Sequence, residues 1–133
     1  MYIDKGLLLS DAQAICTTAS ELSENIIDLT AAKNIARGKQ LYVIITVDTT
    51  FATATSIEFR VMNHSTTTVS SGAIMATTGA IAIANLTAGR APIVIPLGDA
   101  LGNAKRYLGI YYVLTGSAAT AGAVTAFLAV DPV

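Results

Sequence analysis

Histidine and cysteine are common bases, nucleophiles and metal ligands, and this chain of 133 residues has one of each, His64 and Cys16. His64 precedes Ser65, and a Ser-His-Asp hydrolase triad can assemble from residues that lie far apart in sequence. Hydroxyl residues are so frequent here that this adjacency means little. A histidine in a loop or at a strand end is the simpler interpretation. Loss of activity in His64→Ala would test the hydrolase hypothesis.

Cys16 has no second cysteine in the chain with which to form an internal disulfide. Its neighbours Ile15 and Thr17 supply no base that would lower the pKa of the thiol, so we interpret Cys16 as a small buried apolar residue. The nine acidic residues are spread singly from Asp4 to Asp131. Catalysis needs proton donors and nucleophiles held close together. We therefore expect no catalytic residues and no enzyme activity.

The sequence also offers little to a metal or a cofactor. A metal site needs three or four ligands, and one histidine plus one cysteine leave carboxylates and carbonyls to complete it. Asp48-Thr49-Thr50 lacks the dense acidic alternation of a calcium loop, and residues 98–102 lack the Lys and Ser/Thr of a phosphate-binding loop. We expect no metal and no cofactor, although a calcium site built from carbonyls stays open.

The charge balance disfavours a nucleic-acid partner. Eight basic and nine acidic residues give a net charge of −1, and the longest basic run is Lys105-Arg106. Binding to phosphates normally requires a concentrated basic face. Charged residues make up 13% of the chain, against about 25% in ordinary soluble proteins. The surface is therefore expected to consist mainly of Thr, Ser, Ala and Gly.

Residues 107–130 carry no charge and are numerous enough to span a bilayer. Their middle, 115–122, is rich in Gly, Ser and Thr, so we predict two strands joined by a loop rather than a membrane helix. Asp4 and Asp11 bracket the apolar run 6–9, which is too short for a signal peptide. We expect no membrane partner.

Alternating apolar and polar residues predict most of the secondary structure. In the segment 56–61, Ile57, Phe59 and Val61 fall on one face and the polar residues on the other, which is typical of a strand with one wet side. Residues 41–48 repeat the pattern, but Tyr42 and Ile44 indicate that the opposite face is partly covered. This strand is therefore expected to be central or at an interface. Further strands are expected over 25–29, 73–76, 81–86, 93–96, 106–114 and 123–130.

Short strands at this spacing favour an all-β sandwich or barrel. One helical turn at most is expected, over 29–35, where Thr30 could cap it. The Thr-rich stretch 64–71 is expected to be a mobile loop. No shift in composition marks a boundary, so we expect one domain over residues 1–133.

Two features point to contact with other proteins. Adjacent residues of a strand face opposite ways, so one ring of the pair Tyr111-Tyr112 can enter the core while the other reaches the surface or a partner. The apolar stretch 1–9 is either an arm that pairs with a neighbour's sheet edge or an ordinary first strand of the same domain. Small, hydroxyl-rich residues suit association by shape and by added strands.

Several segments resemble the cement (decoration) proteins of tailed-bacteriophage capsids, of the Bordetella phage type. The resemblance runs nearly from end to end, although residues 64–78 contribute little. Its motifs are structural rather than catalytic. The segments that carry it are Ile3-Asp4-Lys5, Leu9-Ser10-Asp11-Ala12-Gln13, Ile26-Ile27-Asp28-Leu29, Leu41-Tyr42-Val43, Arg106-Tyr107-Leu108-Gly109-Ile110-Tyr111-Tyr112 and Ala121-Gly122-Ala123-Val124-Thr125-Ala126.

The resemblance implies a jelly-roll-like antiparallel β-sandwich of about eight strands. It also implies a homodimer or homotrimer that is assembled in the bacterial host cytoplasm, binds the outer capsid surface of the virion and holds neighbouring major capsid proteins together non-covalently. The family offers no catalytic residues to transfer. The candidate contacts are Tyr2, Ile3 and Lys5 in the arm, and one of Tyr111 and Tyr112.

A carbohydrate- or receptor-binding β-sandwich module of a phage tail or a bacterial surface is the alternative. Sugar binding usually uses an exposed aromatic platform with polar groups nearby. The absence of tryptophan and the scattered tyrosines count against that alternative.

Overall fold

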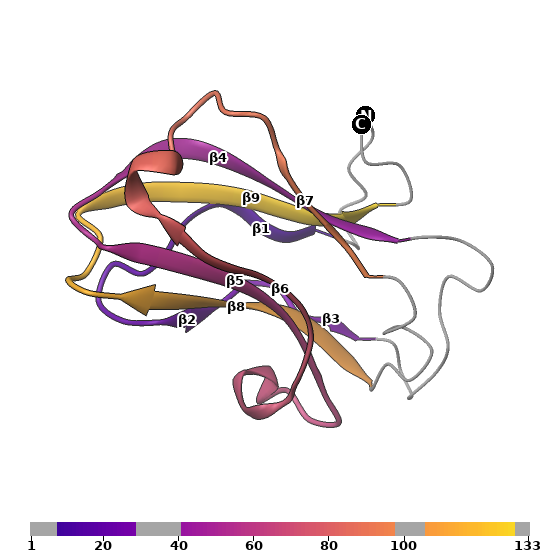
Figure 1. Ribbon diagram of the computed structural model, residues 1–133. Coiled ribbons are helices and arrows are strands. Elements are labelled where there is room, and N and C mark those ends of the chain that lie inside the picture. Colours follow the sequence, from indigo (N-terminus) through magenta and orange to yellow (C-terminus); the bar gives the residue numbers. More distant parts are fainter. Residues whose placement is uncertain (1–7, 29–40, 98–105, 130–133) are drawn as a thin grey trace.

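The computed structural model describes residues 8–28, 41–97 and 106–129. Two antiparallel sheets lie face to face, and the described part of the chain has no helix longer than a 3-10 turn (Figure 1). The all-β prediction is confirmed. The elements are β1 (Leu8–Ala14), β2 (Glu21–Leu22), β3 (Ile27–Asp28), β4 (Tyr42–Ala52), β5 (Ser56–His64), η2 (Val69–Ser71), β6 (Ala73–Ala82), η3 (Ile83–Asn85), β7 (Ile93–Pro96), β8 (Tyr107–Thr115) and β9 (Ala121–Ala129).

The strand order defines the topology. One sheet has the order β1-β9-β4-β7, and the other has the order β2-β8-β5-β6, with β3 also paired to β8. The chain passes repeatedly from one sheet to the other, while β5 and β6 form a hairpin within one sheet. If β2 and β3 are counted as one edge position, this is the two-sheet order of a jelly roll.

The core lies between the sheets, and alternation explains which residues enter it. Ile57, Phe59 and Val61 of β5 are fully buried, as their spacing predicts, and pair with inward residues of β8. From the other sheet, Val43 and Ile45 of β4 face them and are also fully buried. The period of two in each strand therefore places one apolar face of each sheet against the other.

Strand β4 is central, as predicted, because it pairs with β9 on one side and with β7 on the other. Its second face is partly covered, as predicted, since Ile44 is fully buried although it lies outside the main core cluster, whereas Asp48 on the same face is exposed. The uncharged stretch predicted to form two strands does so, as β8 and β9. Within the described residues, no helix has the length and apolar character needed to cross a membrane.

Several strand predictions need correction. Residues 73–76 and 81–86 are not separate strands, because β6 runs unbroken over Ala73–Ala82 and η3 follows it. A bulge lets β6 continue: the pairing register shifts between Glu58 and Arg60, where Thr78 and Gly79 of β6 together lie opposite the single residue Phe59 of β5. The part of β1 after residue 9 and the whole of β2 were not predicted. The strand expected over 25–29 corresponds to β3, which covers only Ile27–Asp28 among the described residues.

The turns differ from expectation as well. The helical turn expected over 29–35 lies outside the described residues. The described residues contain two 3-10 turns, η2 and η3, at positions that the sequence did not indicate. The expected loop over 64–71 contains η2, and Val69 within it is fully buried. Burial of Val69 anchors this loop to the outer face of the β5–β8 sheet, where Gly109 lies beneath its side chain.

Candidate contact surface

His64 is the last residue of β5, and its surroundings are those of a strand-end histidine. Its Nδ1 accepts a hydrogen bond from the backbone N–H of Thr66 at 2.9 Å, and the Thr66 hydroxyl lies equally close. In the described ranges, no three His, Cys, Asp or Glu side chains are grouped as a metal site would require. The structure therefore places His64 in a local turn, and no ion pair joins it to a carboxylate of the described residues.

Cys16 is fully buried, as predicted. Its Sγ donates weakly to the backbone carbonyl of Tyr112 at 3.8 Å. Burial, reinforced by the negative charge of Glu21, raises the pKa of the thiol from 9.0 to about 12. Because the thiolate is the reactive form, this thiol is protected from modification in the folded protein.

This pKa shift predicts a loss of stability at high pH. Above pH 9 the unfolded chain releases the thiol proton, whereas the folded chain keeps it until about pH 12. The unfolded state then binds fewer protons, so the free energy of unfolding falls between pH 9 and 12, by up to about 1.4 kcal/mol per pH unit from this group. Urea unfolding at pH 8, 10 and 11 measures the slope, and Cys16→Ala should make it shallower. An equal slope in Cys16→Ala would contradict the assignment.

The adjacent tyrosines face opposite ways, as predicted. Tyr112 is fully buried, and its ring meets the ring of Phe59 edge to face at 5.6 Å between centroids. Tyr111 is half-buried on the outer face of β8, directly opposite Arg60 of β5. Of the two rings, only that of Tyr111 is therefore accessible to a partner, and the buried ring of Tyr112 is not.

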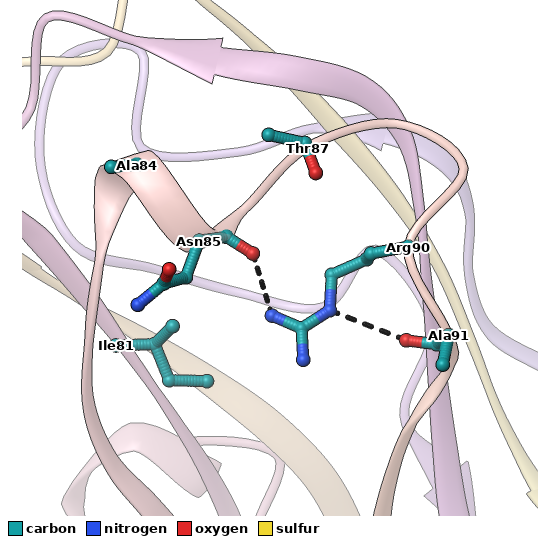
Figure 2. Close-up of a pocket in the computed structure, with 6 residues that line it drawn as sticks. All are labelled: Ile81, Ala84, Asn85, Thr87, Arg90 and Ala91. Carbon is teal, nitrogen blue, oxygen red and sulfur yellow. Dashed lines mark hydrogen bonds between the residues drawn. The ribbon is translucent and has the colours of Figure 1, made fainter.

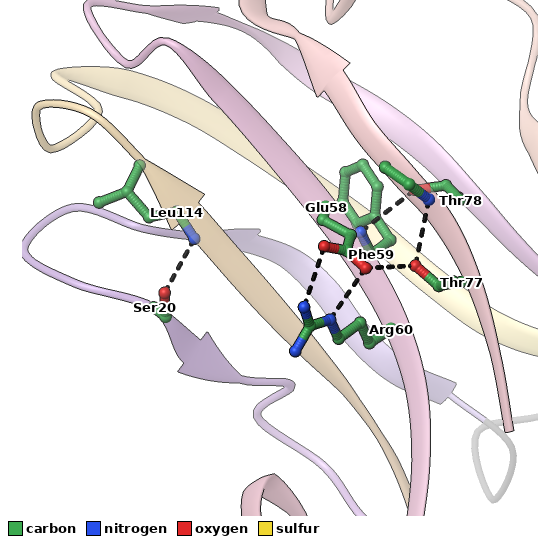
Figure 3. Close-up of polar contacts among 8 residues, drawn as sticks. Ser20, Glu58, Phe59, Arg60, Thr77, Thr78 and Leu114 are labelled. Carbon is green, nitrogen blue, oxygen red and sulfur yellow. Dashed lines mark hydrogen bonds and ion pairs between the residues drawn. The ribbon is translucent and has the colours of Figure 1, made fainter. Parts of the chain in front are cut away.

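Four residues around Tyr111 complete what we call the tyrosine patch: Val113, Glu58, Arg60 and Thr77. The Arg60 Nε and Nη2 donate to the two Glu58 carboxylate oxygens at 2.9 and 3.2 Å, and the Thr77 hydroxyl donates to Glu58 at 2.6 Å (Figure 3). These hydrogen bonds, that of Arg60 first, hold the pKa of Glu58 below its usual value. Arg60 and Glu58 are thus fixed in one geometry on the sheet surface.

The sequence indicated only part of this arrangement. Alternation over 56–61 places Glu58 and Arg60 on one outward face, but the contribution of Thr77 depends on how β6 pairs with β5.

Arg106, of the dibasic pair, binds Asp28 through two hydrogen bonds and lies over the Tyr107 ring at 4.9 Å. The arm candidates Tyr2, Ile3 and Lys5 lie outside the described residues.

The sheet edges disfavour association by added strands. The edge strands β1 and β6 each carry two register shifts. On the other edges, β7 has four residues and ends at Pro96, while β2 and β3 have two residues each. Bulges, prolines and short strands protect edges from pairing with another chain. For the stretch 1–9, an arm and a first strand of the same domain were both possible; its residues 8 and 9 belong to β1, which pairs with β9 of the same chain.

Together, the fold and the tyrosine patch define a jelly-roll β-sandwich protein with an ordered surface of tyrosine, arginine and aliphatic side chains. Tyrosine and arginine are enriched where proteins contact one another. The chain belongs to the Bbp16 family, whose model matches residues 9–128. The match extends from β1 to β9 and indicates a family of Bordetella phage proteins. No curated protein matches the chain in sequence.

Proposed function

We propose that this protein is a capsid cement protein. It binds the outer surface of a tailed-phage icosahedral capsid as a homo-oligomer and holds neighbouring major capsid proteins together without covalent bonds. The observation that carries the proposal is the match to a phage protein family over residues 9–128. The resemblance to phage cement proteins and the ordered side chains of the tyrosine patch support it.

The mechanism rests on symmetry. A capsid presents many identical sites, so an oligomer that binds one site holds its other subunits near the next at high effective concentration. Many weak contacts then act together and resist the internal pressure of packaged DNA. A rigid jelly roll suits this role because its contact surface loses little conformational entropy on binding.

The tyrosine patch is the proposed contact surface, together with the arm residues Tyr2, Ile3 and Lys5. The ring of Tyr111 is a large contact group with few rotatable bonds, and the Glu58 carboxylate already holds the Arg60 guanidinium in place. Both features reduce the ordering cost of association.

Co-sedimentation with expanded capsids that lack this protein tests the function. We expect saturable binding at a fixed ratio to the major capsid protein, and higher capsid survival after heat or osmotic shock. If the protein stays in the supernatant while the capsids are intact, the cement function fails. A glycan-binding screen would then examine the carbohydrate-binding alternative.

Replacing Tyr111 by alanine tests the contact surface. We expect capsid affinity to fall about 10- to 30-fold, because a central aromatic contact residue typically contributes about 1.4–2 kcal/mol or more. Tyr42→Ala is the matched control, since Tyr42 is also half-buried but lies on β4 of the other sheet. Equal affinity losses in the two variants would show that the tyrosine patch is not the contact surface, even if the capsid is bound.

A further inference from the structure

Arg90 differs from the other two arginines in the described ranges. Arg60 and Arg106 each bind a carboxylate of their own chain through two hydrogen bonds. Arg90 instead donates from Nη1 to the backbone carbonyl of Asn85 at 2.6 Å and from Nε to that of Ala91 at 3.2 Å (Figure 2). Carbonyls orient the guanidinium but carry no negative charge, so its positive charge has no carboxylate partner in the described part of the chain.

The Arg90 guanidinium lies in an open depression of about 430 Å³ between η3 and β7. Residues Ile81, Ala84, Asn85, Thr87, Arg90 and Ala91 line it. Figure 2 shows Nη2 directed into the space between Ile81 and Ala91, with the Thr87 hydroxyl on the same side of the loop as the guanidinium. Arg90 as a residue is half-buried, and both hydrogen bonds of its guanidinium are exposed, so the guanidinium stays accessible to a ligand.

The geometry favours a carboxylate as the ligand. A guanidinium has five N–H donors, and the two carbonyl contacts use two of them, which leaves donors on Nη1 and Nη2. Parallel donors on a guanidinium match the two oxygens of a carboxylate. Because the carbonyls of Asn85 and Ala91 already hold the side chain, little further ordering is needed on binding.

We propose that this depression binds the carboxylate of an Asp or Glu side chain on a partner protein. The depression is open, so a side chain already held on a protein surface can reach it without being enclosed. The site is separate from the tyrosine patch, which lies on the outer face of β5 and β8. The identity of the partner as a capsid protein rests on the proposed function, whereas the affinity for a carboxylate does not.

A titration of the full chain with sodium acetate tests the site directly, because acetate carries the same carboxylate. Sodium chloride keeps the ionic strength constant, and heteronuclear NMR follows the Arg90 Nε–H and the backbone amides of Asn85 and Ala91. We expect saturable shifts at these groups, and their loss in Arg90→Gln. In Arg90→Lys, which keeps the charge but lacks parallel donors, we expect weaker binding.

Arg106→Gln is the matched control. The Arg106 guanidinium already binds the Asp28 carboxylate, so its replacement should leave the acetate-induced shifts unchanged. Linear shifts, or shifts unchanged in a folded Arg90→Gln, would overturn the proposal. Tighter saturation by phosphate than by acetate would also overturn it, in favour of a phosphate site. Co-sedimentation of Arg90→Gln with capsids then tests the partner: if the wild-type protein itself fails to sediment, the proposed function fails while the acetate result stands.

Discussion

Replacing Tyr112 by alanine is expected to lower the free energy of unfolding by about 3–5 kcal/mol, the usual cost of removing a buried aromatic ring. Tyr112 is fully buried, and the change removes its edge-to-face contact with Phe59 and leaves a cavity between the sheets. It also removes the hydroxyl that contacts Ser10 at 2.6 Å across the sandwich. Thermal unfolding followed by circular dichroism should show a midpoint lower by roughly 10 °C or more.

Tyr112→Phe separates the ring from its hydroxyl. The Ser10 hydroxyl donates to Gln13 Oε1 at 2.7 Å, so the Tyr112 hydroxyl is the donor toward Ser10. Removing that donor should cost only about 0.5–1.5 kcal/mol, because Ser10 keeps its bond to Gln13. If the phenylalanine variant were as unstable as the alanine variant, the polar contact across the core rather than ring packing would dominate.

Gly122→Ala is expected to be the second severe substitution, with a loss of about 2–6 kcal/mol in the free energy of unfolding. Gly122 has a φ of +141°, which side-chain-bearing residues rarely adopt, and a Cβ there would lie 2.2 Å from the Phe51 ring. Backbone strain and overpacking each cost about 1–3 kcal/mol. Urea unfolding of the purified variant measures the loss.

Gly89→Ala is the matched control, because Gly89 also has a positive φ, +84°, but an added Cβ would meet no atom within 4 Å. This variant should show the strain alone, about 1–2 kcal/mol. The difference between the two variants then measures the clash with Phe51. Equal losses would mean that the Phe51 ring moves aside freely, which would contradict tight packing at this end of the sandwich.

Sequence patterns predicted the elements whose alternation is strong and failed where pairing decides the outcome. The alternation of apolar and polar residues within 56–61 indicates which side chains face the core, and β5 has the predicted inward residues. Strand β6 reads as two strands because Thr77, Thr78 and Gly79 interrupt its apolar pattern, yet pairing to β5 through a bulge carries it across them. Strand β1 has weak alternation and depends on β9 for its ladder.

The candidate sites divide in the same way. Adjacency alone required Tyr111 and Tyr112 to face opposite ways, because successive side chains of a strand alternate. Which ring is buried depends on which face of β8 packs against the other sheet, and only the structure assigns Tyr112 to the core. No sequence pattern marked Arg90, since the carbonyl contacts of its guanidinium, in place of a carboxylate of the described residues, depend on which groups the loop after η3 brings near it.

The all-β class, the inward faces of β4 and β5 and the burial of Cys16 were predictable without the structure, because they follow from local alternation and residue type. The jelly-roll strand order, the protected sheet edges, the tyrosine patch and the Arg90 depression depend on the tertiary structure. Each of these joins residues that are distant in sequence, as Ser10 and Tyr112 are joined across the core. Such contacts form only when the two whole sheets pack against each other, so a local sequence pattern does not predict them.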